Sequence, residues 1–231
     1  NMPIKDISSL KLAEQQDQLP VKKRSKGEIT REKILIAAIE ILALNGIKGT
    51  THRAIASHAE LQLSLTTYYF KDIQELIHQA FRLNSNRILF RSDTLLKESI
   101  FAISKIEKKE LRKTAVKEKL CQHLSKVTTE KLIENIKHQA ISIAVEQLML
   151  TEIQVTPELR SLIQEHQSTQ LVPYQQLCQF FNKVDPELDA KIMYTQFSQL
   201  QYGQLTKQIN IDNKLIEQTT HRIFTWVMSL K

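Results

Sequence analysis

Apolar residues recur at helical spacing along most of this 231-residue chain. No stretch alternates apolar and polar residues for long enough to predict a half-buried strand. The 4 Gly and 5 Pro are few, whereas Leu, Ile, Gln, Lys and Glu are plentiful, a composition that favours helix. The sequence therefore predicts an all-α protein, with a length that suits one small domain and one larger domain.

The first clear helix is expected to begin just after Ser25. Ser25 and Glu28 have the spacing of a capping box, in which the Ser oxygen accepts a backbone N–H and the Glu side chain reaches back. This helix should end near Gly46, because glycine readily takes the left-handed conformation found at helix C-termini. Residues 1–24 are polar and are expected to form a flexible arm.

Two short helical segments follow, separated by about four residues. Thr51 suits an N-cap, and Arg53 to Ala59 can make two turns of helix. The pattern is then interrupted and resumes from Ser64 to Phe70. A short helix, a tight turn and a second short helix are typical of a helix-turn-helix, here at about residues 51–70, whose second helix enters the major groove of DNA.

Several elements around this motif coincide in order and spacing with those of a known family. They are Ile34-Leu35, Ala37-Ala38, Gly46, Thr50-Thr51, Ile55-Ala56, Tyr68-Tyr69-Phe70 and Glu75-Leu76. Over roughly residues 28–80, the chain resembles the TetR family of bacterial transcriptional regulators. The resemblance implies an N-terminal three-helix DNA-binding domain (residues 25–81) and a larger C-terminal helical domain (residues 82–231) for ligand binding and dimerisation. It also implies a homodimeric regulator, expected to be a repressor, that binds a pseudo-palindromic double-stranded DNA operator and is released by an unidentified small-molecule effector.

The charge distribution agrees with a polyanionic partner. The chain carries a formal net charge of +7, and residues 20–53 contain eight Lys or Arg against three Glu. Lys22, Lys23, Arg24 and Lys26 are expected either to reach the DNA backbone or minor groove, or to belong to a solubilising tail.

The motif and the family pattern together give a set of DNA-contacting residues. Arg53 and Lys71 are assigned to phosphates, although Arg53 would also suit a surface salt bridge. Tyr68 is open to two interpretations, DNA contact or core, whereas Phe70 is expected in the core. The full set comprises Lys26, Thr51, His52, Arg53, Leu63, Ser64, Leu65, Thr67, Tyr68, Tyr69 and Lys71.

Four departures from the family pattern bear on DNA recognition. Glu60 replaces the usual turn glycine, Gln62 a common Ser cap, Thr67 the first Tyr, and Ile73 a frequent phosphate-binding Lys. The alternative function is therefore an all-α ligand carrier or protein-interaction module whose helix-turn-helix no longer reads DNA.

The C-terminal part predicts a dimer interface and a ligand pocket. Helices are expected at about 94–107, 111–126, 129–150, 157–166, 169–182, 187–206 and 212–229. The last two contain an apolar helical stripe and a small residue that another helix could approach, unless the stripe is buried in the subunit's own core. The predicted interface comprises Ile192, Gly203, Ile216, Thr220, Ile223 and Val227. The predicted pocket comprises Phe101, His123, Gln147 and Phe180, chosen only as polar or aromatic groups with apolar neighbours.

Other classes of function find no support in the sequence. It lacks HExxH, Gly-rich phosphate loops, Gly-x-Ser-x-Gly and CxxC, so no enzyme, metal site or cofactor is predicted. Cys121 and Cys178 do not indicate a disulfide framework, and no apolar run is long enough to predict a membrane helix. With no recognisable signal peptide, the expected location is the cytoplasm.

Overall fold

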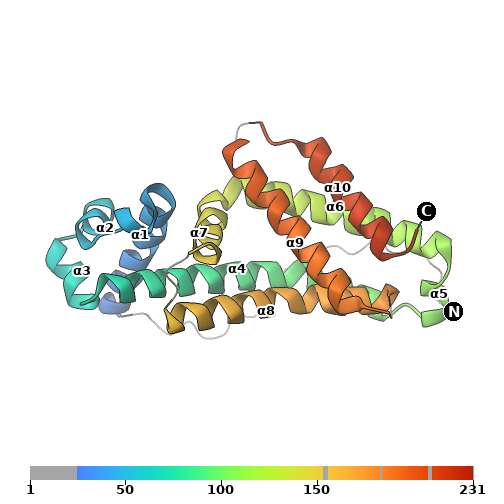
Figure 1. Cartoon of the computed structure of the whole chain (residues 1–231), viewed down its shortest axis with the longest axis horizontal. Coiled ribbons are helices and arrows are strands. Elements are labelled where there is room, and N and C mark those ends of the chain that lie inside the picture. The colour runs from blue at the N-terminus through green and yellow to red at the C-terminus, as the bar shows by residue number, and fades with distance from the viewer. Residues whose placement is uncertain (1–24, 153–155, 183, 208–209, 231) are drawn as a thin grey trace.

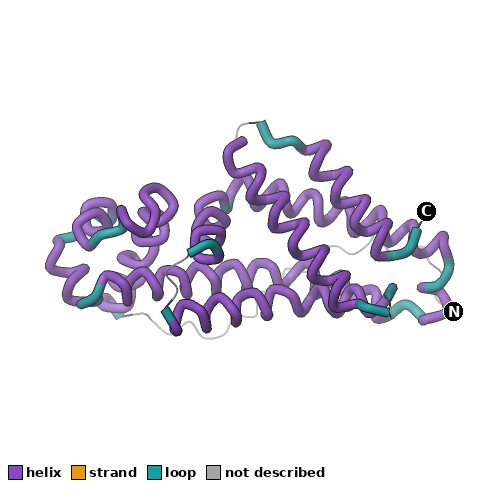
Figure 2. The backbone as a smooth tube through the Cα atoms, viewed as in Figure 1, coloured by secondary structure: helices purple, strands orange, loops and turns teal. Residues whose placement is uncertain are grey.

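The computed structural model describes residues 25–152, 156–182, 184–207 and 210–230, and within them every regular element is a helix (Figures 1 and 2). The all-α prediction is confirmed. The predicted arm, residues 1–24, lies outside the described residues. The helices are α1 (Lys26–Gly49), α2 (His52–His58), α3 (Leu63–Tyr69), α4 (Ile73–Ser104), α5 (Lys108–Leu111), α6 (Thr114–His138), α7 (Ala140–Leu150), α8 (Pro157–Phe181), α9 (Pro186–Gln204), a 3-10 turn (Leu205–Lys207) and α10 (Asn213–Val227).

Helix α1 begins and bends where the sequence indicates. Ser25 Oγ accepts the N–H of Glu28, and Glu28 Oε2 accepts the N–H of Ser25, which completes the predicted capping box. Gly46 has φ 66°, the left-handed conformation that glycine adopts without steric cost. One further turn follows before Thr50, whose hydroxyl donates to the Gly46 carbonyl at 2.8 Å.

The helices form an elongated molecule with the helix-turn-helix at one end (Figure 1). Helices α4 and α8 pack along each other, and α9 packs on α8. At the other side α10 packs on α6. Helix α7 lies between these parts and contacts α1, α4, α6 and α9. None of the described helices is both long and apolar enough to span a membrane.

Several predicted helix boundaries are wrong. The segment that follows the helix-turn-helix and the helix predicted over 94–107 are one continuous α4. The predicted helix 129–150 is interrupted at Gln139, whose φ of −125° and ψ of 19° turn α7 away from α6 and onto α1. The helices predicted over 157–166 and 169–182 are one continuous α8, and Pro173 lies inside it without ending it. Proline removes one backbone hydrogen bond there, and burial of Leu177 and Cys178 in the next turn offsets that loss.

Two clusters of buried apolar side chains stabilise the fold. The first joins α1–α4 to Val145 and Met149 of α7 and to Leu159 and Leu162 of α8. The second lies between α6, α8, α9 and α10. The helix-turn-helix therefore shares its core with α7 and α8. A shift of either helix alters the packing of residues 25–81, which are called the reading unit below.

Candidate functional site

The helix-turn-helix is fixed by a side-chain cap and a cross-helix contact. Thr51 Oγ1 accepts the N–H of Ala54 at 3.1 Å and so caps α2. His58 Nε2 lies 2.6 Å from Glu40 Oε2, which ties the end of α2 to α1. Ile55 and Ala56 are buried beneath this contact. Helix α2, which precedes the predicted DNA-reading helix α3, is thus held at both ends.

The turn of the motif contains an unusual residue. Glu60, which stands where the family pattern has glycine, has φ 53°. Its backbone N–H still donates to the Ser57 carbonyl, and that of Leu61 to the Ala56 carbonyl. The turn geometry is therefore retained although a side chain in this conformation costs free energy.

Helix α3 presents one face to solvent and buries the other. Ser64 and Thr67 are exposed, and Tyr68 is 76% exposed. Thr66 and Phe70, by contrast, are completely buried. The structure thus resolves the alternative for Tyr68 in favour of the outer face and confirms Phe70 as core. Of the remaining predicted contacts on this helix, Leu63 is exposed, and Leu65 and Tyr69 are half-buried.

Tyr69 leans back against α1. A Cβ atom at Gly27 would lie 3.3 Å from the Tyr69 hydroxyl, so the phenol ring reaches over the first turn of that helix. Its ring also meets Tyr68 edge to face, with 5.1 Å between centroids. Tyr69 therefore packs α3 against α1 and is half-buried.

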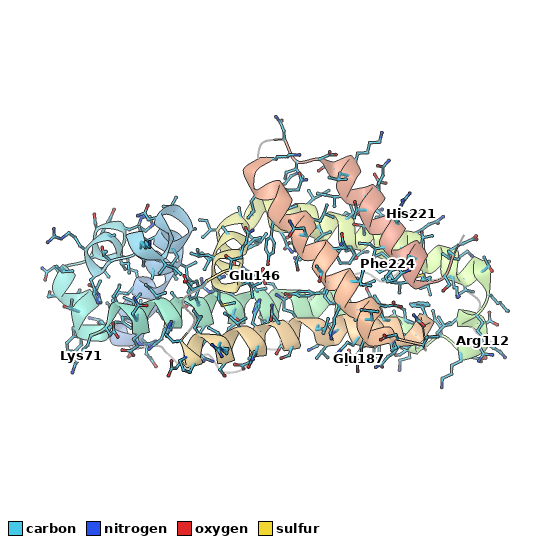
Figure 3. All side chains as sticks on the ribbon, in the orientation of Figure 1. Lys71, Arg112, Glu146, Glu187, His221 and Phe224 are labelled. Atoms are coloured by element: carbon cyan, nitrogen blue, oxygen red, sulfur yellow. The ribbon has the colours of Figure 1, made fainter. Side chains whose placement is uncertain are left out.

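The basic residues predicted to bind phosphate lie at the surface of this end of the molecule. Lys26, Arg53 and Lys71 are exposed, and Figure 3 shows Lys71 at the helix-turn-helix end, with Arg112 at the opposite end. His52 differs, because both of its ring nitrogens are shielded from solvent without a hydrogen-bond partner. Its side chain is consequently poorly placed to bind DNA in this conformation.

A cavity of about 580 Å³ lies among α4, α6, α7, α8, α9 and α10. Its wall contains Glu146, Tyr174, Tyr194, Phe197 and Phe224. In Figure 3, Glu146 lies nearer the helix-turn-helix and Phe224 farther along the molecule. The cavity therefore extends along the helices and has the size and apolar character of a small-molecule site.

The predicted pocket residues are not in this wall, and the prediction is corrected here. Phe101 is 64% exposed on α4, and His123, Gln147 and Phe180 also lie outside the lining. Helical periodicity does not show which neighbouring helix a face meets, so the sequence alone does not place these side chains. One feature of the sequence does point to the cavity: Glu146 is the only charged residue of α7, AISIAVEQLML. A charge within so apolar a helix is informative because it requires a partner or a function.

Glu146 belongs to a buried chain of polar side chains. Its Oε1 lies 2.7 Å from His166 Nε2 and accepts Gln170 Nε2 at 2.7 Å. His166, fully buried, places Nδ1 2.7 Å from Ser85 Oγ. This polar network connects α4, α7 and α8, and its members Glu146 and Gln170 line the cavity.

The pKa values of three tyrosines are raised, in part by the negative charge of Glu146. Burial, followed by nearby Tyr194 and Glu146, raises the pKa of Tyr174. Burial and Glu146 raise the pKa of Tyr194 to about 12, and burial followed by Glu146 raises that of Tyr202. All three phenols therefore remain protonated at neutral pH.

The predicted dimer stripe is also corrected. Ile216, Thr220, Ile223 and Val227 are all buried within the chain itself, in the core where α10 packs on α6. The alternative, burial in the subunit's own core, holds for these four. Ile192 and Gly203 do lie at the surface, and a Cβ at Gly203 would meet nothing within 4 Å.

Comparisons with known proteins identify the fold. No protein-family model and no curated protein matches the sequence. Solved structures do match: a TetR-family member from Streptomyces coelicolor has a TM-score of 0.56 at 18% identity, over 84% of this chain and 97% of that one. The transcriptional regulator FadR from Bacillus subtilis, in complex with stearoyl-CoA, has a TM-score of 0.60 at 18% identity, over 84% and 96%. A protein from Saccharomonospora viridis in complex with choline has a TM-score of 0.59 at 16% identity, over 84% and 95%.

Proposed function

We propose that this chain, whose all-α fold is similar to that of TetR-family transcriptional regulators, is a ligand-responsive DNA-binding regulator that acts as a homodimeric repressor. The observation that carries the proposal is the position of α7. Val145 and Met149 of this helix pack in the core of the reading unit, whereas Glu146 lines the cavity.

On this proposal, residues 25–81 bind DNA through the outer face of α3 and the basic residues around it. Ser64, Thr67 and Tyr68 are exposed and carry hydroxyl groups that suit contacts to bases or phosphates. Arg53 and Lys71 supply charge for the backbone. Two such units related by a twofold axis would bind two half-sites of a pseudo-palindrome.

Ligand control would act through α7 and α4. A ligand that moves Glu146 also moves its neighbours Val145 and Met149, which are packed against α1. Close packing transmits such a shift, because the core has no free volume to absorb it. The ligand releases DNA only if it binds more tightly to the conformation with the unsuitable spacing of reading units.

Dimerisation is proposed through the outer faces of α9 and α10. Leu188 and Ile192 on α9, and Leu215 and Trp226 on α10, are large apolar residues at least 38% exposed in the single chain. The two residues of each pair are spaced so that both lie on the same side of their helix. These faces would cover one another across a twofold axis, with Gly203 allowing close approach.

The first experiment is fluorescence anisotropy with the DNA upstream of the chain's own gene and with a random duplex of equal length. A DNA-binding regulator should prefer the upstream DNA by about 10³-fold or more at fixed salt. The alternative, a ligand carrier or interaction module, predicts weak binding that is equal for both duplexes. That result would refute the proposed function.

Two of the similar solved structures carry ligands that differ in charge and length, stearoyl-CoA and choline. The fold therefore does not determine the effector. Its chemistry has to be derived from the residues of this cavity.

A further inference from the structure

The cavity contains a carboxylate that lacks a permanent cationic partner among its hydrogen-bonded neighbours. Glu146 is only 7% exposed. Its Oε1 accepts a hydrogen bond from Gln170 Nε2 and lies within hydrogen-bond distance of His166 Nε2. A glutamine is neutral, and a histidine is charged only when protonated. Buried charges are normally paired, so this position favours a cation arriving from the cavity.

Aromatic rings continue from this carboxylate along the wall. The ring centroid of Tyr174 lies 5.9 Å from that of Tyr194 and 6.2 Å from that of Phe197. Phe197 is in turn 6.1 Å from Phe224. The faces of such rings attract cations electrostatically and bury the apolar groups attached to them.

Pro173 adds an acceptor to the same wall. Proline has no N–H, so the carbonyl of Thr169, four residues earlier in α8, loses its helical donor. Both residues line the cavity. The part of α8 that lines the cavity next to the aromatic rings thus contains a carbonyl without its usual helical donor.

From this arrangement we infer that the cavity binds an amphiphilic cation, an alkylated or protonated amine with an apolar tail. The charged head lies beside Glu146, and the tail extends past Tyr174 and Phe197 towards Phe224. The inference rests on the proposed function, since it names the effector class of the proposed regulator.

Cationic residues in the wall do not reverse this assignment. Lys97 is exposed, Lys131 forms an ion pair with Glu134 at 3.1 Å, and Arg91 donates to Gln139 and Ser142. All three retain more access to water than Glu146 does. A charge interaction is about four times stronger at the effective dielectric constant of a partly buried pair than in water. The deepest charge therefore dominates the choice of headgroup.

The test uses three ligands with the same ten-carbon tail and different heads: decyltrimethylammonium, decanol and decanoate. Each is titrated calorimetrically below its micelle concentration into the full chain without DNA. Decyltrimethylammonium should bind about tenfold or more tightly than decanol, and decanoate should bind most weakly. Equal affinities for the three, or tightest binding of decanoate, would overturn the inference.

Two variants locate the charge. Glu146→Gln keeps the size and one acceptor and should reduce the preference for decyltrimethylammonium over decanol by about tenfold. Glu118→Gln makes the same chemical change at an exposed position of α6 outside the cavity lining and should leave the preference unaltered. An unchanged preference in Glu146→Gln would place the cation elsewhere and contradict the inference. The headgroup comparison on the unmodified chain remains decisive if Glu146→Gln does not fold.

This experiment is independent of DNA binding. A chain that discriminates between duplexes but not between headgroups refutes the inference and leaves the proposed function intact. A chain that selects the ammonium head but no DNA supports the cation site and refutes the regulator.

Discussion

His166 Nε2 lies 2.7 Å from Glu146 Oε1, and this contact joins α8 to α7 within the buried interior. On its other side, the imidazole meets Ser85 of α4 at the same distance. One ring thus connects α4, α7 and α8, which line the cavity and also pack in the core shared with the helix-turn-helix. Because the ring is fully buried, water cannot replace it.

The first prediction concerns this histidine. His166→Ala removes one partner from both Glu146 and Ser85, so we expect the free energy of unfolding to fall by about 1–3 kcal/mol. Urea denaturation followed by circular dichroism measures the change. Gln167→Ala, at an exposed position of the same helix, is the control and should change stability by less than about 0.5 kcal/mol. Equal stabilities for the two variants would contradict the role given to His166.

The second prediction concerns the turn of the helix-turn-helix. Glu60 has φ 53°, a conformation that costs a residue with a side chain about 1–2 kcal/mol and glycine almost nothing. After the entropy that glycine loses on folding, Glu60→Gly should raise the free energy of unfolding by about 0.5–1 kcal/mol. Thermal denaturation should show a higher midpoint. Gln62→Gly, two residues later with φ −68°, has no such strain to relieve and should not stabilise the chain.

These residues also show how far the sequence predicts the structure. The capping box at Ser25 and the left-handed Gly46 follow from local chemistry, and both are present. The sequence leaves the face of Tyr68 open, because a shift of one residue turns a helix position by about 100° and can move it from the outer side to the inner side. Short helices carry too few apolar positions to fix that register.

The cavity and the interface depend on contacts between distant helices. The apolar stripe that contains Ile216 and Ile223 is equally compatible with a core position and with a dimer interface. Only the packing of α10 on α6 shows that it belongs to the core. Likewise, the partners of Glu146 come from 20 and 24 residues farther along the chain. A pattern along one helix cannot specify which helix packs against it.

The third prediction concerns the phosphate contacts. Arg53→Ala and Lys71→Ala should each weaken binding to operator and random DNA by similar factors. Each should also reduce the slope of log K against log salt by about 0.9 if one phosphate contact is lost. Arg112→Ala, at the opposite end of the molecule in Figure 3, is the control. A variant that altered sequence preference while keeping non-specific affinity would show that its residue reads bases instead.

The fourth prediction separates reading from folding on α3. Tyr68→Ala truncates a ring that is 76% exposed, so stability should change by less than about 0.5 kcal/mol. If Tyr68 reads bases, operator affinity should fall by about 1–3 kcal/mol, with a smaller effect on random DNA; Thr67→Ala should behave similarly. Phe70→Ala, two residues away, empties a fully buried site and should cost about 3–5 kcal/mol of stability. If Tyr68→Ala failed to fold, Tyr68 would have to be assigned to the core and not to the DNA-contacting face.

The last prediction tests the dimer through two residues of α10. Trp226 is 46% exposed and Ile223 only 8%, although they are three residues apart. Trp226→Glu should therefore leave the helix content unchanged and place a carboxylate in the proposed interface, where it would have to be desolvated. Sedimentation at micromolar concentration should show a dimer for the unmodified chain and a monomer for this variant.

Ile223→Glu puts the same charge into the core between α10 and α6, and it should unfold the chain instead of only separating subunits. Lys119→Glu, at an exposed position of α6 outside the proposed interface, is a control for a change in charge and should remain a dimer. Because one reading unit holds only one half-site, Trp226→Glu should also lose tight operator binding while retaining weak binding to random DNA. A Trp226→Glu chain that sediments as a dimer would exclude this face as the interface, and a monomeric unmodified chain would exclude the two-headed mechanism altogether.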